Sequence, residues 1–336
     1  MKNRSKIAIV TGGAGFIGSH MVDLLISKKF KVYVIDNLSG GHLKNLKHHF
    51  NNSNFIFKKM NILDLDTNLK LFKKVDFIFH FAGIGEMVPS IENPKEYMIT
   101  NIQGTVKMLE AARRGKVKKF LYAASASCYG MGKKLTNEKH EIKTEHPYAL
   151  SKYLGEQSAM HWHQVYNLPV NSIRIFNAYG SRVRTAGSYG AVIGVFFKQK
   201  IKKKPLTIVG TGNQTRDFVH VTDVAKAFYA AAQSKKSGQI YNVGTGKPKS
   251  VNYLANLIGG KKIFIPDRPG EPKDSSADIR KIKKDLNWRP LISFDKGISE
   301  MLKVLHEWND APLWTPKKIK KVTKNWFKYL KRKNYA

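Results

Sequence analysis

The first half of the chain alternates short apolar runs with longer stretches in which apolar residues recur every three or four positions. The apolar runs predict β-strands at 7–11, 31–36, 54–57, 76–81, 118–123 and 170–176. The periodicity between them predicts helices at 16–28, 65–74, 94–114 and 146–166. Strands that alternate with helices are typical of a parallel sheet covered by helices on both faces, so a doubly wound α/β fold is expected.

The second half of the chain is less regular. It predicts helices at 188–201, 221–234, 250–258, 279–286, 294–308 and 316–332, with short strands near 206–209 and 239–243. We therefore expect a first domain over residues 1–175, with later returns near 212–243. Residues 176–336 would mainly form a smaller α/β lobe that ends in a basic helix.

Composition and charge narrow the class of protein. The single cysteine, Cys128, excludes an intramolecular disulfide and a cysteine-ligated metal cluster. No apolar run approaches the roughly 20 residues that a membrane-spanning helix needs, and the apolar stretch at the N-terminus is too short for a signal peptide. A cytoplasmic protein is expected.

The formal net charge of +35 raises the question of an anionic partner, such as nucleic acid or a membrane surface. The lysines, however, are dispersed over almost every predicted helix and loop, and no nucleic-acid motif is present. We interpret the charge as that of a solvated surface, and no nucleic-acid partner is expected.

The first predicted strand runs into the glycine-rich sequence TGGAGFIGSH. Gly13, Gly15 and Gly18 have the spacing G-x-G-x-x-G, and Gly12, Gly15 and Gly18 have the spacing G-x-x-G-x-x-G. Glycines between a strand and a helix permit a tight turn and let backbone N–H groups approach a pyrophosphate. Asp36 closes the second strand and could accept hydrogen bonds from a ribose, which favours NAD over NADP as the bound dinucleotide.

A possible acid–base pair lies in PYALSKYLGE, residues 147–156. Tyr148 and Lys152 are four residues apart, so their side chains are neighbours on one helix face. A phenol normally has a pKa near ~10, and an adjacent ammonium together with an oxidised nicotinamide would favour the phenolate. Tyr148 could then take a proton from a substrate hydroxyl while hydride leaves for the cofactor.

These motifs occur in the order and at the spacing of a known family. They are TGGAGFIG, Asp36, HFAG (80–83), TNIQGT (100–105), the Ser125 segment, Tyr148-x-x-x-Lys152, RIFNAYG (174–180), RDFVHVTDVA (216–225), YNVGTG (241–246) and RPGEP (268–272). Over roughly residues 5–310 the chain resembles the extended short-chain dehydrogenase/reductases that act as nucleotide-sugar epimerases and dehydratases, UDP-glucose (UDP-galactose) 4-epimerase among them. The resemblance implies a Rossmann-like NAD-binding domain and a smaller substrate-binding lobe.

The resemblance also assigns roles to residues. It implies catalytic roles for Ser125, Tyr148 and Lys152, with Lys152 also holding the nicotinamide ribose. The cofactor NAD would be bound by Gly12, Gly15, Phe16, Ile17, Gly18, Asp36, Asn37, Asn61, Ile62, Phe81, Ala82, Gly83, Asn101, Tyr148 and Lys152. The substrate would be bound by Ser125, Asn177, Arg216, Arg268, Ser275 and Asp278, with the two arginines clamping its diphosphate. No metal site is expected.

The strand end AASASCYG, residues 123–130, indicates which reaction follows oxidation of the sugar at carbon 4. Eliminating members of the family carry a carboxylate directly after the hydroxyl residue, because elimination needs its own acid and base. Here Ala126 and Ser127 follow Ser125. We therefore expect 4-epimerisation of a UDP-sugar through a 4-keto intermediate. The alternatives are a UDP-glucuronate epimerase, a nucleotide-sugar dehydratase, or a protein that binds nucleotide sugar without turnover.

Further expectations concern the sugar, the assembly and the C-terminus. Ser275, small for a position near the sugar's 2-substituent, leaves room for an N-acetyl group, so both UDP-glucose/galactose and UDP-N-acetylglucosamine/galactosamine are candidates. A homodimer through the helices at 94–114 and 146–166 is implied by the resemblance. After Pro316 the apolar residues form one helical stripe: Ile319, Val322, Trp326, Phe327 and Leu330. That stripe would pack on the substrate lobe or a partner subunit, or alternatively rest on a membrane surface.

Overall fold

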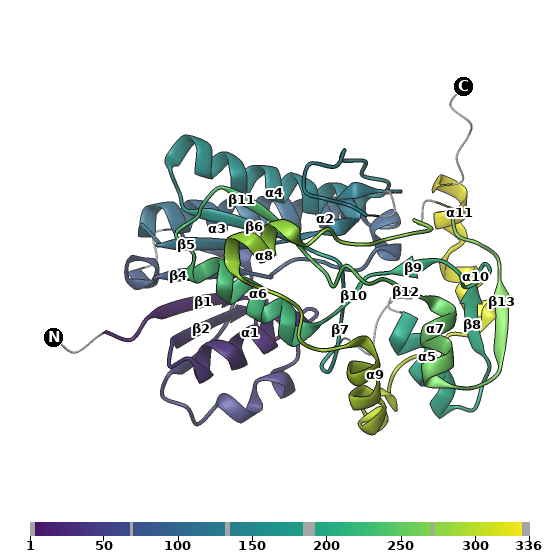
Figure 1. Cartoon of the computed structure of the whole chain (residues 1–336). Coiled ribbons are helices and arrows are strands. Elements are labelled where there is room, and N and C mark those ends of the chain that lie inside the picture. The colour runs from purple at the N-terminus through teal and green to yellow at the C-terminus, as the bar shows by residue number, and fades with distance from the viewer. Residues whose placement is uncertain (1–3, 68–69, 132–134, 184–191, 270–271, 331–336) are drawn as a thin grey trace.

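A sheet of seven parallel strands forms the centre of the protein (Figure 1). The computed structural model describes residues 4–67, 70–131, 135–183, 192–269 and 272–330. The strand order is β11-β6-β5-β4-β1-β2-β3. Their bounds are Ile7–Thr11 (β1), Lys31–Asp36 (β2), Phe55–Lys59 (β3), Phe77–His80 (β4), Lys119–Ser125 (β5), Val170–Ile175 (β6) and Gln239–Val243 (β11). The predicted doubly wound sheet is therefore confirmed.

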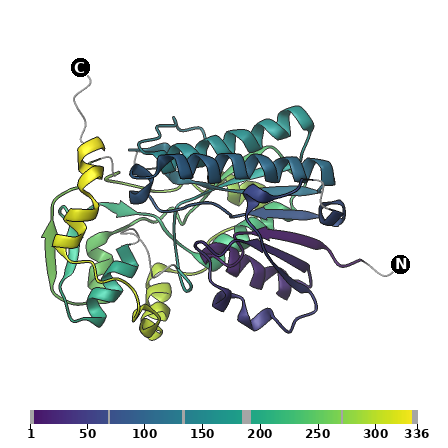
Figure 2. The ribbon, with the colours of Figure 1, turned by 180° about the vertical axis from the view of Figure 1, so that it is seen from behind.

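Side chains of the central strand β1 alternate between two apolar layers. Ala8 and Val10 of β1 pack with the helices α1 (Phe16–Ser27), α6 (Val221–Gln233) and α8 (Arg280–Leu286). Ile9, between them, packs on the opposite face with α3 (Gly104–Gly115) and α4 (Pro147–Tyr166). Figure 2 shows α3 and α4 side by side on that face. Strands buried on both faces are the reason for the near-continuous apolar runs in the sequence.

The smaller lobe has its own apolar core and lies at the carboxyl edge of the sheet. It contains α5 (Val192–Ile201), α7 (Val251–Ile258), α9 (Phe294–Lys303) and α10 (Pro316–Val322), which pack around the paired strands β8 (Leu206–Val209) and β13 (Lys262–Ile265). Two further short pairs were not predicted: β7 (Asn177–Tyr179) with β10 (Phe218–His220), and β9 (Thr215–Arg216) with β12 (Lys249–Ser250).

Some predicted helices have different bounds in the structure. The helix expected at 94–114 consists of α2 (Pro94–Met98), a π-helical turn (Ile99–Gln103) and α3. In the segment 65–74, the described residues form a 3₁₀ turn, Lys70–Lys74, and residues 68–69 lie outside the described ranges. Residues 188–191 of the helix expected at 188–201 also lie outside them. The helix expected at 294–308 ends at Lys303 and is followed by a 3₁₀ turn, Leu305–Trp308.

The C-terminal segment forms two short helices rather than one. α10 ends at Val322 and α11 (Lys324–Leu330) follows, so the chain bends at Thr323. Ile319 and Trp326 are buried at 4% and 2% exposure. These two residues of the apolar stripe are thus turned towards the protein, as the packing alternative expects. Among the described residues, no helix has the length and apolar character needed to span a membrane.

Candidate active site

A cavity of about 930 Å³ lies where the carboxyl edge of the sheet meets the smaller lobe. Residues at or just after the ends of four neighbouring strands line it: Gly12 after β1, Asp36 in β2, Phe81 after β4 and Ser125 in β5. The smaller lobe contributes Arg268, among others, to the opposite wall. Ligands of doubly wound folds bind outside the carboxyl ends of the strands, so this cavity is the candidate active site.

The glycine-rich turn forms a part of the cavity wall that is too closely packed for side chains at Gly12 and Gly18. Gly12 has a φ of +67°, and a Cβ there would lie 2.7 Å from the backbone nitrogen of Ala82. A Cβ on Gly18 would lie 2.2 Å from the carbonyl oxygen of Gly12. The helix α1 starts directly after Gly15, which provides no side-chain cap for the first N–H groups. These bare amides and the positive end of the helix suit the pyrophosphate of a dinucleotide.

Asp36 is fixed at the rim of the same part of the cavity. Its Oδ2 accepts a hydrogen bond from the Ala14 N–H at 2.9 Å, and its Oδ1 accepts one from the Leu38 N–H at 2.8 Å. Burial raises the pKa of the carboxyl group, while the two amide hydrogen bonds oppose that shift. Each oxygen keeps a second lone pair, so the oriented carboxylate can still accept the hydroxyls of a ribose.

Most of the residues expected at the cofactor line the cavity. Besides Gly12, Gly18 and Asp36 these are Gly15, Phe16, Ile17, Asn37, Asn61, Ile62, Phe81, Ala82, Gly83, Tyr148 and Lys152. The bare glycine turn, the oriented carboxylate and the small residues Ala82 and Gly83 together fit NAD.

Asn101, also expected at the cofactor, is not among the residues that line the cavity, and its contact with NAD stays a prediction. It is 1% exposed. Its Oδ1 accepts from the Ile84 N–H at 2.8 Å, and its Nδ2 donates to Ile84 O at 3.1 Å and to Ser151 Oγ at 2.9 Å. Asn101 thus holds the segment after β4 against α4. In this structure it supports the cavity wall behind Gly83 instead of facing the cavity.

Ser125, Tyr148 and Lys152 converge on the cavity from two elements. β5 ends at Ser125, whose Oγ lies 2.8 Å from Ser127 Oγ. α4 brings Tyr148 and Lys152 to one face, one turn apart. The Lys152 ammonium lies 4.6 Å from the centre of the Tyr122 ring, a cation–π contact that fixes it from behind.

Burial shifts the pKa values of both α4 residues in the direction that disfavours charge. It raises the pKa of the Tyr148 phenol, while a hydrogen bond with Ser125 opposes that increase. It lowers the pKa of Lys152 to about 8, while the nearby Glu156 carboxylate opposes that shift. Tyr148 is therefore neutral in the protein alone, and the positive charge of an oxidised nicotinamide would favour its ionisation.

Most of the residues expected only at the substrate line the cavity. Asn177, Arg216, Arg268 and Ser275 line the cavity. Arg216 is held by hydrogen bonds from its Nη1 to the carbonyl oxygens of Thr215 and Pro272, both at 2.8 Å. Two guanidinium groups and an amide on one wall suit a diphosphate.

Asp278, also expected at the substrate, is not among the residues that line the cavity. Its carboxylate accepts hydrogen bonds from Arg280 Nε at 3.0 Å and Nη2 at 2.5 Å. This pairing lowers the pKa of the Asp278 carboxyl group. This pair lies at the start of α8, and the contact of Asp278 with the nucleotide ribose stays a prediction.

Two cavity residues were missed by the motifs. His146 caps α4, with its Nδ1 accepting from the Ala149 N–H at 3.2 Å, and its ring stacks on Tyr148 with centroids 5.9 Å apart. Trp326 of α11 reaches the same place from the far end of the chain, with its ring 5.5 Å from that of His146. The only sequence signals were the position directly before Pro147 and membership of the C-terminal apolar stripe.

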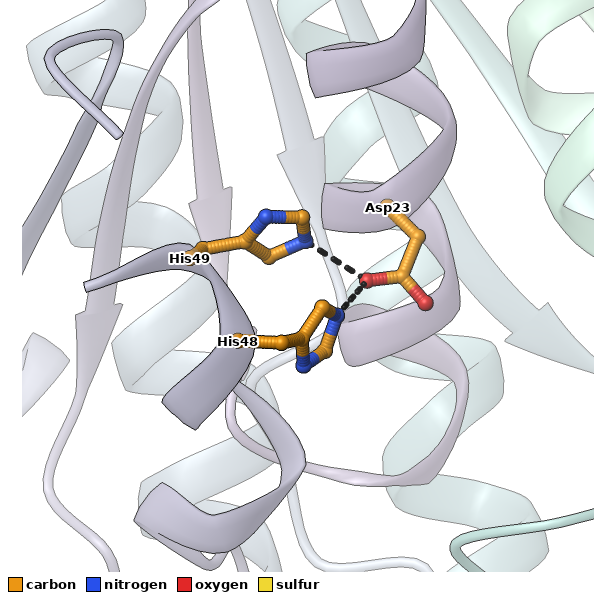
Figure 3. A group of neighbouring side chains, drawn as sticks. All are labelled: Asp23, His48 and His49. Atoms are coloured by element: carbon orange, nitrogen blue, oxygen red, sulfur yellow. Dashed lines mark hydrogen bonds and ion pairs between the residues drawn. The ribbon is translucent and has the colours of Figure 1, made fainter. Parts of the chain in front are cut away.

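A second polar cluster joins Asp23 of α1 to His48 and His49 (Figure 3). Asp23 Oδ1 accepts from His48 Nε2 at 2.8 Å and from His49 Nε2 at 2.7 Å, and Asp23 Oδ2 pairs with Arg182 at 2.7 Å. The three groups from Asp23, His48 and His49 lie close enough together to hold a metal ion. Since Arg182 already neutralises the carboxylate, we interpret the cluster as an anchor between α1 and the chain beyond Tyr179.

Comparisons with known proteins agree with the cradle and the polar groups of the cavity. The sequence profile of the NAD dependent epimerase/dehydratase family matches residues 8–244. The UDP-glucose 4-epimerase of Mycolicibacterium smegmatis is 34% identical over 301 residues, which cover 87% of this chain and 96% of that protein. Similar proteins also include nucleotide-sugar decarboxylases.

Solved structures give the same result. The UDP-N-acetylglucosamine 4-epimerase from Methanobrevibacter ruminantium, in complex with UDP-N-acetylmuramic acid, matches with a TM-score of 0.85 at 32% identity, over 91% of this chain and 98% of that one. The UDP-glucuronic acid 4-epimerase from Bacillus cereus, in complex with UDP-glucuronic acid and NAD, matches with a TM-score of 0.84 at 30% identity, over 90% and 99%. The Rossmann-like architecture and the family resemblance are thereby confirmed.

Proposed function

Because the chain belongs to the NAD-dependent epimerase/dehydratase family, we propose that it catalyses the 4-epimerisation of a UDP-sugar. NAD is the cofactor of this family and would supply a hydride acceptor and donor at carbon 4 of the sugar. The observation that carries the proposal is the end of β5. Ser125 faces the cavity with Tyr148 and Lys152, and the two residues after it, Ala126 and Ser127, bear no carboxylate.

Tyr148 is the proposed base and then the acid. Its phenolate takes the proton of the sugar's 4-hydroxyl as hydride leaves carbon 4, and it returns that proton after the keto sugar has turned its other face. Lys152, held against Tyr122, stabilises the phenolate by its charge. Ser125, held in turn by Ser127, donates a hydrogen bond to the 4-oxygen. The cycle ends with no net oxidation.

The opposite wall is proposed to bind the nucleotide diphosphate. Arg216 and Arg268 supply guanidinium groups, Asn177 supplies an amide, and all three line the cavity. Ser275 lines it as well, and its short side chain supports a sugar with or without an N-acetyl group. We further propose a cytoplasmic homodimer, in which α4 and the helical segment 94–114 beside it face the same helices of a second copy.

The experiment is product analysis by NMR. The purified protein with NAD is offered UDP-glucose, UDP-N-acetylglucosamine and UDP-glucuronate separately. We expect the 4-epimer of one or more of these sugars to form, and Tyr148→Phe, which keeps the ring but has no proton to exchange, to reduce the rate by about 10²- to 10⁴-fold.

Each alternative has its own product. An accumulating 4-keto or unsaturated sugar would assign the protein to the dehydratases, and turnover of UDP-glucuronate alone to the glucuronate epimerases. Tight binding of a UDP-sugar without any product would leave a non-catalytic binding protein. Turnover that survives Tyr148→Phe would remove the proposed base.

A further inference from the structure

The last helix of the chain enters the candidate active site. α11 lies well beyond residue 244, where the family match ends. Trp326 of α11 is 2% exposed and lines the cavity that Tyr148 and Ser125 also line. Ile319 of the preceding α10 belongs to the apolar core of the smaller lobe, whereas Trp326 does not. α10 is therefore the attachment of this segment, and α11 extends from it to the cavity.

α11 contacts three separate segments of the cavity wall. The Trp326 indole N–H donates to Pro269 O at 2.8 Å, next to the proposed phosphate ligand Arg268. Asn325 Nδ2 donates to both carboxylate oxygens of Glu92 at 2.9 Å. Glu92 directly follows the 3₁₀ turn Val88–Ile91, which contributes Val88 and Pro89 to the cavity. One short helix thus connects the two sides of the cavity.

The third contact leads to the proposed base. The Trp326 ring lies 5.5 Å from the His146 ring, and the His146 ring stacks on Tyr148 with an angle of 5° between the planes. His146 also accepts the Ala149 N–H through Nδ1, which requires an unprotonated ring nitrogen. Burial lowers the pKa of His146 to about 4, so the ring stays neutral and keeps this cap. The position of Tyr148 therefore depends on a ring that Trp326 supports.

We propose that α11 is a clamp on the sugar-binding part of the active site, in which Trp326 is a positioning residue that sets Tyr148 through His146 and the Arg268 segment through Pro269. This inference rests on the proposed epimerase function for its kinetic consequence. A tryptophan with a packing role alone would contact a single apolar core, as Trp308 does in the smaller lobe. Trp326 instead contacts His146 and Pro269, which belong to two different segments of the cavity wall.

The test compares Trp326→Ala and Trp326→Phe with a matched control on the same helix. Tyr329→Ala removes an aromatic ring three residues further on, which is 62% exposed. Since a displacement of about 1 Å at a reacting group can cost 10²-fold, we expect kcat for the epimerisation to fall about 10- to 100-fold in Trp326→Ala. Affinity for UDP alone, which needs the Arg268 segment and not Tyr148, should also fall in Trp326→Ala and stay unchanged in Tyr329→Ala. Trp326→Phe should retain the ring contact with His146 and lose the hydrogen bond to Pro269, so its kcat should lie between those of the wild type and Trp326→Ala.

Hydrogen–deuterium exchange provides a readout that does not require turnover. Amides at the start of α4, residues 148–152, should exchange faster in Trp326→Ala than in the wild type and in Tyr329→Ala. If the alanine variant does not fold, Trp326→Phe is compared in the same way. Unchanged exchange together with an unchanged kcat would overturn the clamp. A wild type that epimerises no UDP-sugar would overturn the proposed function instead, while the exchange pattern would still decide on the clamp.

Discussion

At the scale of single residues, the buried pair of Arg174 and Glu156 connects stability to the active site. Arg174 Nε donates to the two carboxylate oxygens of Glu156 at 3.2 and 3.0 Å, and the side chains are 3% and 1% exposed. Ser172 Oγ donates to Glu156 as well, at 2.8 Å. The same carboxylate opposes the lowering of the Lys152 pKa. Glu156 therefore has two roles that no motif around Tyr148 revealed.

Replacing Glu156 should lower the stability of the fold and should also lower the pKa of Lys152, because the carboxylate that opposes its decrease is lost. Glu156→Gln leaves the Arg174 guanidinium buried without its counterion, so we expect a loss of about 3–5 kcal/mol in the free energy of unfolding, measured by urea denaturation. The exposed pair of Lys296 and Glu300, with N and O 4.0 Å apart, provides the control, since Glu300→Gln should leave stability nearly unchanged. Equal effects of the two substitutions would contradict the assignment.

The residue scale also shows where prediction from sequence succeeded and where it did not. Tyr148 and Lys152 could be paired from their spacing alone, because four residues make one turn of a helix whatever the surroundings. For Asn101 and Asp278, whose ligand contacts stay predictions, the sequence did not reveal the partners within the protein, which are Ile84 and Ser151 for Asn101 and Arg280 for Asp278. Which partner a polar side chain finds depends on distant segments, and the local sequence contains no record of that choice.

At the scale of elements, α4 has one face in the core and another in solvent. Its inner face contributes Tyr148, Lys152 and Glu156, while Leu150 and Val165, at 36% and 53% exposure, lie on the outer side. α3 lies alongside α4 (Figure 2). Exposed apolar side chains on a long helix support the proposed pairing of α4 with a second copy.

The homodimer can be tested through this outer face. Leu150→Lys combined with Val165→Lys places like charges opposite each other across the proposed interface, and should convert a dimer to a monomer in sedimentation velocity measurements. Phe264→Lys, on the exposed strand β13 with 57% exposure, should leave the assembly unchanged. A wild type that sediments as a monomer, or a double variant that remains dimeric, would contradict the proposed interface.

Element types were predictable where the periodicity was long, and the interruptions were not. The helix expected at 94–114 contains a π-helical turn at Ile99–Gln103, which places Asn101 against Ile84 and Ser151. Such a turn costs regular hydrogen bonds and persists where tertiary contacts compensate. The division of the C-terminal segment into α10 and α11 at Thr323 was not predicted either, and Ile319 and Trp326 on its two sides are buried in the core of the smaller lobe and at the cavity.

At the scale of the whole molecule, three buried histidines connect stability to pH. Burial lowers the pKa of His20 to about 4, of His80 to about 3 and of His146 to about 4. His20 Nε2 is hydrogen-bonded to Ser181 O at 3.1 Å, and His80 lies between the hydroxyls of Thr11 and Thr105 at 2.7 and 3.0 Å. All three rings are neutral in the folded protein at pH values where the unfolded chain binds a proton.

Stability should therefore decrease as the pH falls from 6.5 towards 4. In this window the unfolded state binds more protons, and each histidine contributes up to about 1.4 kcal/mol per pH unit. Melting temperatures across the window measure the slope. His20→Gln should reduce it, and His306→Gln, at an exposed position outside the proposed interface, should not. A melting temperature that stays constant or rises on acidification would contradict the argument.

The sequence by itself determined the alternation of strands and helices, the glycine turn, the acid that closes β2 and the Tyr148–Lys152 pair, because each of these depends on contacts within a few residues. It also determined the absence of a carboxylate after Ser125. Only the tertiary structure decided which polar side chains face the cavity, and that α11 reaches it from the end of the chain. Those outcomes depend on packing between segments that are up to hundreds of residues apart, and local patterns do not encode such contacts.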